Sequence, residues 1–116
     1  DIKALGRRAV ALPLNVADSS SFATFATEVR KVLAQHWQRE HFDALVNNAG
    51  VGIYASLMDT TEAQFDELMN IHFKGVFFLT QKLLPLIADG GRIVNISTGL
   101  TRFALPNYSA NACAVE

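Results

Sequence analysis

The sequence predicts an α/β fold with a doubly wound parallel sheet. Three short apolar runs alternate along the chain with two longer segments of helical periodicity. The runs are rich in Val, Ile, Leu and Ala, a composition typical of strands that are buried on both faces of a sheet. The order strand, helix, strand, helix, strand implies right-handed crossovers and helices on both faces.

The candidate strands cover residues 9–16, 42–46 and 92–96. Pro13 lies inside the first run and limits its regular strand to the first part of the run. Ligands of such sheets bind beyond the carboxyl ends of the strands. The informative residues therefore follow each strand, at Asn15, at 47–50 and at 97–99.

The first helical segment lies between the first two strands, and Asp18 or Ser19 is its candidate N-cap. Its apolar residues recur every three or four positions, at Phe22, Phe25, Val29, Val32, Leu33 and Trp37.

The second helical segment lies between the second and third strands. Its periodic residues are Phe65, Leu68, His72, Val76, Leu79 and Leu83. Asp59 with Glu62 resembles a capping arrangement, and Gly90 with Gly91 is expected to end the segment. Gly75 and Pro85 interrupt the pattern, so one long bent helix and two shorter helices are both open.

Composition excludes several classes of protein. The 116 residues suit one domain, and a formal net charge of -1 gives no basic excess that would suggest nucleic acid as a partner. No apolar run approaches the roughly 20 residues that a membrane helix needs. Cys113 is the only cysteine, which excludes an internal disulfide and fits the cytoplasm. We identify no metal-binding cluster.

The most specific stretch is "LVNNAG", which ends at Gly50. It places two amides, a small residue and a glycine directly after a buried strand. Gly50 can adopt backbone angles closed to other residues and lets a flat ligand lie against the chain. Taken by itself, the stretch is better explained as a polar turn that ends a strand, because short motifs match by chance.

Four stretches together carry a resemblance. "DALVNNAG", "FKGVFFLTQKLLPLI", "GGRIVNIST" and "YSANACAVE", in this order and spacing, resemble the short-chain dehydrogenase/reductase family over essentially the whole chain. The resemblance implies a Rossmann-type sheet of which residues 1–116 form part of a single dinucleotide-binding domain. It also implies a hydride transfer between NAD or NADP, with NADP favoured, and a small carbonyl or alcohol substrate. Members of the family commonly form homo-oligomers.

The resemblance assigns two groups of cofactor-binding residues. The "NNAG" segment would border the adenine-ribose side of the cofactor and steady the sheet; it consists of Asn47, Asn48, Ala49 and Gly50. Asn15 and Val16 stand where the family usually has Asp-Val. An amide oxygen still accepts hydrogen bonds, so adenine contact is retained but loses its charge assistance.

One departure from the family concerns the start of the chain. The family's glycine-rich turn, which wraps the pyrophosphate, is not found in residues 1–116, and "DIKALGRRAV" resembles the tail of the family's second helix. Two strands would then be absent between the first and second strands of this chain. We expect residues outside this sequence or a partner chain to fill that gap, because the exposed apolar surface would otherwise favour association.

Three side chains stand at or beside the family's substrate-binding positions. His72 replaces an asparagine, and it either handles a proton or water or is a packing histidine. Ser97-Thr98 replaces a pair of serines, of which the second usually binds the substrate oxygen. The Thr98 hydroxyl can do so as well, or it can bond to its own loop backbone.

The acid/base tyrosine can be placed in two registers. Without gaps, Tyr108 is that tyrosine and Ala112 replaces the lysine that lowers the phenol pKa in the family. In the second register, Tyr108 is only a preceding aromatic residue, and Asn111 lies at or near the tyrosine position with several residues lost. Tyr108 lies ten residues after Thr98 and Asn111 lies thirteen after it, and the longer spacing fits the family better.

We therefore expect an oxidoreductase of the short-chain type, with Tyr108, Thr98, Ser97 and His72 as its candidate catalytic residues. The alternative is a non-catalytic dinucleotide-fold binding or scaffold protein, which Ala112 and the missing glycine turn favour. A helical interaction domain without a sheet is the third interpretation, and the three strand-like runs argue against it.

Overall fold

The computed structural model describes residues 2–103 and 105–114. Its helices and strands are α1 (Phe22–Trp37), β1 (Phe42–Asn47), α2 (Glu62–Met69), α3 (Val76–Leu83), β2 (Ile87–Asn95) and α4 (Ser109–Ala114). A π-helical segment, Asn70–Gly75, joins α2 to α3, and short 3₁₀ turns cover Ser19–Ser21, Leu84–Leu86 and Gly99–Thr101.

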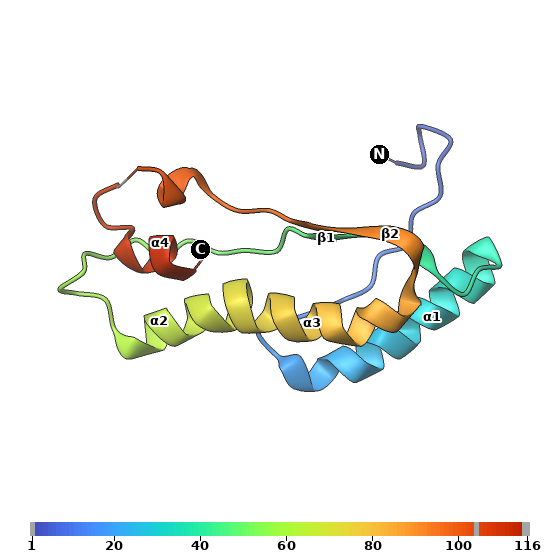
Figure 1. Ribbon diagram of the computed structural model, residues 1–116, viewed down its shortest axis with the longest axis horizontal. Helices are drawn as coiled ribbons and strands as arrows, with labels where there is room; N and C mark the ends of the chain where they lie inside the picture. Colours follow the sequence, from blue (N-terminus) through green and yellow to red (C-terminus); the bar gives the residue numbers. More distant parts are fainter. Residues whose placement is uncertain (1, 104, 115–116) are drawn as a thin grey trace.

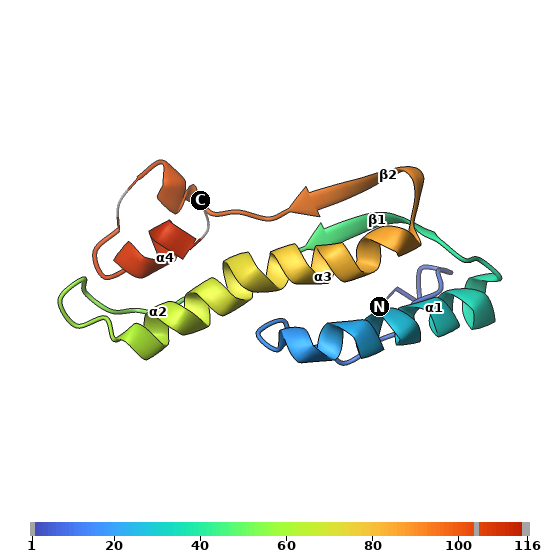
Figure 2. The ribbon, with the colours of Figure 1, turned by 60° about the horizontal axis from the view of Figure 1, so that its bottom comes forward.

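The sheet of the described residues is parallel, as predicted. β1 pairs with β2 from Ala44 opposite Arg92 to Asn47 opposite Asn95. Figures 1 and 2 show α1 and α3 on the same side of this sheet. Two right-handed crossovers that move across a sheet in the same direction place their helices on the same face. We expected helices on both faces of the sheet, but within the described residues the helices α1 and α3 cover one face only.

The first apolar run, 9–16, forms no strand, which corrects the prediction. Its side chains still alternate between half-buried and exposed, as along an extended chain, with Leu12, Leu14 and Val16 on the inner side. A strand needs a neighbouring backbone for its ladder of hydrogen bonds. No described segment pairs with this run, so it crosses the helices as extended coil.

The third strand begins earlier than predicted, at Ile87 instead of residue 92. The helical run stops in a 3₁₀ turn around Pro85, and Gly90 and Gly91 lie inside β2. The register slips between Phe42 and Ala44 of the partner strand. Gly90 has φ +75°, a conformation that favours glycine, so this pair of glycines accommodates an irregular stretch of strand and does not end a helix.

The second helical segment is one long helical run with a π-helical segment in its middle, so the first of the two open alternatives holds. Its start is capped by Thr61, which accepts the backbone N–H of Gln64 while the Gln64 side chain accepts the N–H of Thr61. The predicted cap by Asp59 and Glu62 was wrong. The Asp59 carboxylate instead accepts a hydrogen bond from the Ser56 hydroxyl, within the turn that precedes the helix.

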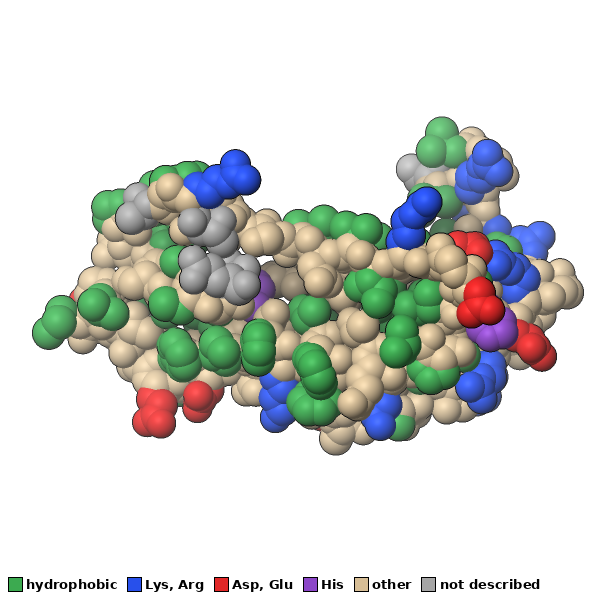
Figure 3. Space-filling model, viewed as in Figure 1, with side chains coloured by type: hydrophobic (Ala, Val, Ile, Leu, Met, Phe, Trp, Pro, Cys, Tyr) green, Lys and Arg blue, Asp and Glu red, His purple; other side chains and the backbone are tan. Residues whose placement is uncertain are grey.

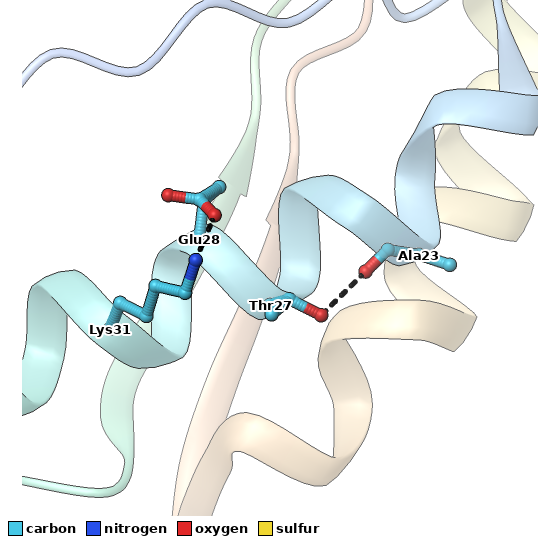
Figure 4. A network of polar contacts seen from close by, with 4 residues as sticks. All are labelled: Ala23, Thr27, Glu28 and Lys31. Atoms are coloured by element: carbon cyan, nitrogen blue, oxygen red, sulfur yellow. Dashed lines mark hydrogen bonds and ion pairs between the residues drawn. The ribbon is translucent and has the colours of Figure 1, made fainter.

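Ser21 is the residue before α1 and makes no side-chain cap, whereas the predicted capping residue Asp18 acts one turn earlier. Its carboxylate accepts the backbone N–H of Ser20 and caps the 3₁₀ turn that leads into the helix. Figure 4 shows two contacts farther along α1, from the Thr27 hydroxyl to the Ala23 carbonyl and from Lys31 to Glu28. The ion pair is exposed, so it adds only a few tenths of a kcal/mol.

The core lies where α1 and α3 pack on the sheet. Phe22 is fully buried and forms one hydrophobic cluster with Leu79, Leu83 and Leu86. The radius of gyration is 16.7 Å, against about 13 Å for a compact domain of this length. Figure 3 shows hydrophobic side chains on the surface near the sheet and the long helix, and Phe73 and Phe77 are 64% and 60% exposed. Among the described residues, no helix has the length and apolar content to cross a membrane.

Candidate active site

The carboxyl ends of β1 and β2 meet at Asn47 and Asn95, which are register partners. The Asn47 Nδ2 group donates to Asn95 Oδ1 at 2.8 Å and to Thr80 Oγ1 of α3 at 3.1 Å. Both amide hydrogens are thus used to tie the two strands to the helix that covers them. These two bonds are compatible with the sheet-steadying role that the family resemblance implies for the "NNAG" segment, which stays a prediction.

A cavity of about 630 Å³ lies at this edge, between β2 and the long helical run. It brings four of the predicted site residues together, namely Asn47, Ala49, His72 and Ser97. Its remaining wall is mostly apolar and includes Phe73 and Phe77. A largely apolar hollow with a few convergent polar groups is typical of a small-molecule site.

A second cavity of about 330 Å³ lies between β1 and the helices α1 and α3, and the segment 47–49 also lines it. Asn47 and Ala49 line both cavities, and Asn48 lines the second only. Leu14 and Val16, from the extended segment, form the far wall of the second cavity. The two cavities therefore meet at Asn47 and Ala49, and they also share Val76 of α3.

His72 is placed by the π-helical segment, and its ring lies over the turn. Its Nε2 atom lies 2.7 Å from the Val51 carbonyl oxygen and 3.3 Å from the Val51 nitrogen. The shorter distance favours the form in which Nε2–H donates to the carbonyl. A Cβ on Gly50 would lie 2.8 Å from His72 Cε1. The position of the His72 ring therefore explains why residue 50 has no side chain. His72 both packs on the turn and lines the larger cavity.

The two hydroxyl residues that follow β2, Ser97 and Thr98, have different surroundings. Ser97 lines the larger cavity. Thr98 is the N-cap of the turn Gly99–Thr101, where its Oγ1 accepts the backbone N–H of Leu100 at 3.5 Å. Its placement corresponds to the bonding within its own loop that the sequence left open as an alternative. Ser97 is therefore the hydroxyl better placed toward the cavity.

Tyr108 lies directly before α4 and faces the segment that follows the turn. Its ring packs edge-on against Tyr54 with a centroid distance of 5.6 Å, and its backbone forms a parallel bridge with Ala55. Tyr108 and Asn111 are not among the described residues that line the larger cavity, although Ala114 of the same helix is. The assignment of the acid/base to either register stays a prediction.

Asn15 and Val16 lie apart from the larger cavity. Asn15 is exposed, and its Oδ1 accepts the backbone N–H of Ala17 at 3.0 Å, which leaves the Nδ2 hydrogens as its donors toward a ligand. The carbonyl of Val16 lies under Gly75, close enough that a Cβ there would meet it at 2.3 Å. The backbone of Val16 therefore packs against the long helical run.

Comparison with known proteins identifies the family. The family model described as short chain dehydrogenase matches residues 1–115. The chain belongs to the short-chain dehydrogenase family. This membership, the parallel α/β architecture and its partial Rossmann-like form confirm what the sequence motifs predicted.

Three members of the short-chain dehydrogenase family illustrate the similarity. A sepiapterin reductase of Chlorobaculum tepidum is 47% identical over 72 residues, which cover 61% of this chain and 28% of that protein. A 2-dehydro-3-deoxy-D-gluconate 5-dehydrogenase of Dickeya dadantii is 32% identical over 98% of this chain and 45% of its own length. The crystal structure of the landomycin C-6 ketoreductase LanV with bound NADP and rabelomycin is 30% identical, with a TM-score of 0.90.

The match to LanV covers 97% of this chain and 46% of the ketoreductase. The chain thus spans less than half the length of these three proteins.

The contact of Asn111 with Ile53 is a feature of the site that the sequence did not predict. The two residues are 58 positions apart, and although Asn111 lies in the family-like stretch "YSANACAVE", the resemblance gives it no contact with the segment after "NNAG". The only signal in the sequence is an amide among small residues on a short helix. That signal does not reveal which backbone the amide meets.

Proposed function

We propose that the protein is an NAD(P)-dependent oxidoreductase that transfers a hydride between the nicotinamide and a carbonyl or secondary alcohol carbon of a small molecule. In this proposal, residues 1–116 form part of a single dinucleotide-binding domain. The observation that carries the proposal is the cavity at the carboxyl edge of the sheet, where the turn 47–50, His72 and Ser97 converge. Membership of the short-chain dehydrogenase family supports it.

The residues of the turn suit one wall of a dinucleotide site. Ala49 and Gly50 are exposed and carry no bulky side chain, and Asn48 presents an exposed amide. These three residues would border the cofactor, and the family pattern assigns Asn15, whose Oδ1 is engaged by Ala17, to the adenine through its Nδ2 hydrogens. The bound cofactor would supply or accept the hydride. We favour NADP over NAD because LanV was solved with NADP.

The proposed roles of the polar side chains follow from their positions. Reduction of a ketone delivers a hydride to carbon and requires a proton on oxygen. Ser97 would donate a hydrogen bond to the substrate oxygen, with Thr98 as the neighbouring hydroxyl. The Nε2 of His72 is engaged by Val51, so Nδ1 is the ring atom that could hold a water molecule or pass a proton.

The proton donor itself is assigned by the family pattern. Tyr108 is our nominal acid/base, since a phenol can give or take the proton as the hydride moves. In the second register, a tyrosine near the position of Asn111 would take this role. We also propose a cytoplasmic homo-oligomer, which the single cysteine and the exposed Phe73 and Phe77 of the long helical run support.

A cofactor oxidation assay tests the proposal. The purified protein is incubated with NADPH or NADH and a panel of small ketones, and the loss of reduced nicotinamide is followed by absorbance. We expect turnover with at least one ketone, a loss of about tenfold or more in kcat/KM for Ser97→Ala, and no change for Thr27→Ala on the exposed face of α1. An absence of oxidation with every ketone would count against an enzyme.

Calorimetric titration with NADP separates that negative result into two cases. Tight binding without turnover would favour the non-catalytic binding protein. If NADP does not bind at all, the protein has no dinucleotide site.

A further inference from the structure

The segment 51–55, which follows the "NNAG" turn, is held at every second residue by a different part of the protein. Val51 contacts the His72 ring of the π-helical segment. Ile53 is bonded by Asn111 of α4. The Ala55 N–H donates to the Asn107 carbonyl at 3.0 Å. Alternate residues of an extended segment point their backbone groups in the same direction, so these contacts fix the segment along its length.

Asn111 makes the most complete of these contacts. It is only 6% exposed, and both ends of its carboxamide bond to Ile53. Its Oδ1 accepts the Ile53 N–H at 2.9 Å, and its Nδ2 donates to the Ile53 carbonyl at 2.5 Å. The side chain therefore pairs with the backbone as a neighbouring strand would. Removing either half leaves a partly buried backbone group without its partner, which is costly.

The position of this pair links α4 to the candidate site. Ala114, one turn after Asn111, lines the larger cavity, and so does Ala49, which lies four residues before Ile53. His72 holds the intervening Val51 and lines the same cavity. The Asn111–Ile53 pair thus closes a short chain of contacts from α4 to the "NNAG" turn.

We propose that Asn111 is a positioning residue, which fixes the segment 51–55 and with it the turn 47–50 against α4. In this role the amide is committed to the Ile53 backbone and takes no part in proton transfer. The consequence for turnover rests on the proposed function. The positional role does not, because it can be measured in the protein without cofactor or substrate.

The Asn111→Asp variant tests the pairing through pH. A protonated carboxyl has one donor and one acceptor, as the amide has, and can restore both bonds to Ile53. An ionised carboxylate can only accept, and it would face the Ile53 carbonyl oxygen in a buried site. Both effects disfavour the charged form and raise the pKa of the Asp carboxyl in the folded protein above its unfolded value. The stabilising contribution is then present at low pH and is lost as the pH rises through the raised pKa.

We expect the melting temperature of Asn111→Asp to match the wild type near pH 3, below the unfolded carboxyl pKa of about 3.9, where the carboxyl is protonated in both the folded and the unfolded protein. It should fall below the wild type by about 4–8 °C near pH 8. Asn111→Leu should lose stability at both pH values. Cys113→Asp adds the same charge to an exposed position of α4, and its difference from the wild type should stay flat with pH.

The effects of other titrating groups cancel when the melting temperature of the wild type is subtracted from that of Asn111→Asp at each pH, because both proteins contain the same groups. On the surrounding elements these groups are His72, Tyr54, Tyr108, Cys113, Glu62, Asp66 and Glu67. A loss in Asn111→Asp that is equal at both pH values, or no loss at either, would overturn the proposal.

Hydrogen exchange of the Ile53 amide gives a second measurement, which does not depend on a variant that folds. In the wild type this amide should exchange slowly for a residue outside helices and strands, because its partner oxygen is buried. Exchange as fast as that of an exposed loop amide would contradict the pairing.

The effect on turnover is measured separately. If the proposed function holds, Asn111→Asp near pH 8 should raise the KM for the cofactor more than it lowers kcat, because the turn moves while the reacting groups remain. If the protein turns over no ketone, the melting and exchange results still decide the role of Asn111.

Discussion

Replacement of Gly75 by alanine tests the packing that holds the extended segment under the long helical run. Gly75 is buried at the end of the π-helical segment. A Cβ at this position would lie 2.3 Å from the Val16 carbonyl oxygen and 2.9 Å from the Asn70 carbonyl oxygen. Ordinary contacts of a Cβ begin at 3.4 Å, so the two backbones would have to separate by roughly 1 Å.

Two opposing free energies decide the sign of the effect. In an exposed helix, Gly→Ala stabilises by about 1 kcal/mol. Overpacking of a close-packed site costs about 1–3 kcal/mol, and the cost lies at the upper end here because backbone atoms cannot rotate away. The expected result is a net destabilisation of about 2 kcal/mol, which lowers the melting temperature of a domain of this size by roughly 8 °C or more.

Thermal unfolding followed by circular dichroism measures this effect. Gly52→Ala is the matched control, since its Cβ would meet its nearest atoms, in Asn111 and Tyr108, at 3.8 Å. The control should change stability by less than about 1 kcal/mol. If Gly75→Ala were as stable as the wild type or more stable, the close approach of Val16 to the long helical run would be refuted.

Three further predictions concern single interactions. Asn47→Leu should lower the free energy of unfolding in urea by about 1–3 kcal/mol, because Thr80 and Asn95 lose their hydrogen-bond donor. An unchanged urea midpoint would show that Asn47 does not stabilise the junction of the strands and the helix. Thr61→Ala should cost about 1 kcal/mol and Thr61→Ser much less, since serine keeps the capping hydroxyl; equal losses in urea unfolding would argue against the cap. The hydrogen bonds from Arg39 lower the pKa of the Asp43 carboxyl. The stability that this ion pair contributes is therefore present above the ordinary carboxyl pKa and is lost as the pH falls through the lowered pKa of Asp43. NMR titration should show the pKa of Asp43 rising in Arg39→Gln.

The sequence was sufficient for the features that depend on local pattern. The end of β1 at Asn47, the helical periodicity of α1 and the Asp18 cap were predicted because each is set by neighbouring residues. The parallel pairing followed from the order of the elements, which allows few topologies.

The features that it did not predict depend on distant partners. The run 9–16 has the composition of a strand, but a strand exists only where another backbone pairs with it. Gly90 resembled the end of a helix because positive-φ glycines serve both helix ends and irregular strands. The contact of Asn111 with Ile53 joins residues 58 positions apart, and no local pattern records it.

Cofactor titration of a charge variant tests the central claim most directly, namely that the "NNAG" turn borders a dinucleotide site. Asn48 is exposed on this turn, so Asn48→Asp adds a negative charge there without disturbing a buried contact. By calorimetry, we expect NADP to bind the wild type and to bind Asn48→Asp about fivefold more weakly at low salt, through repulsion of its phosphates. Gln35→Glu, which adds the same charge to the exposed face of α1, should bind NADP as the wild type does. Equal affinity in all three proteins, or no binding of NADP by the wild type, would contradict the account.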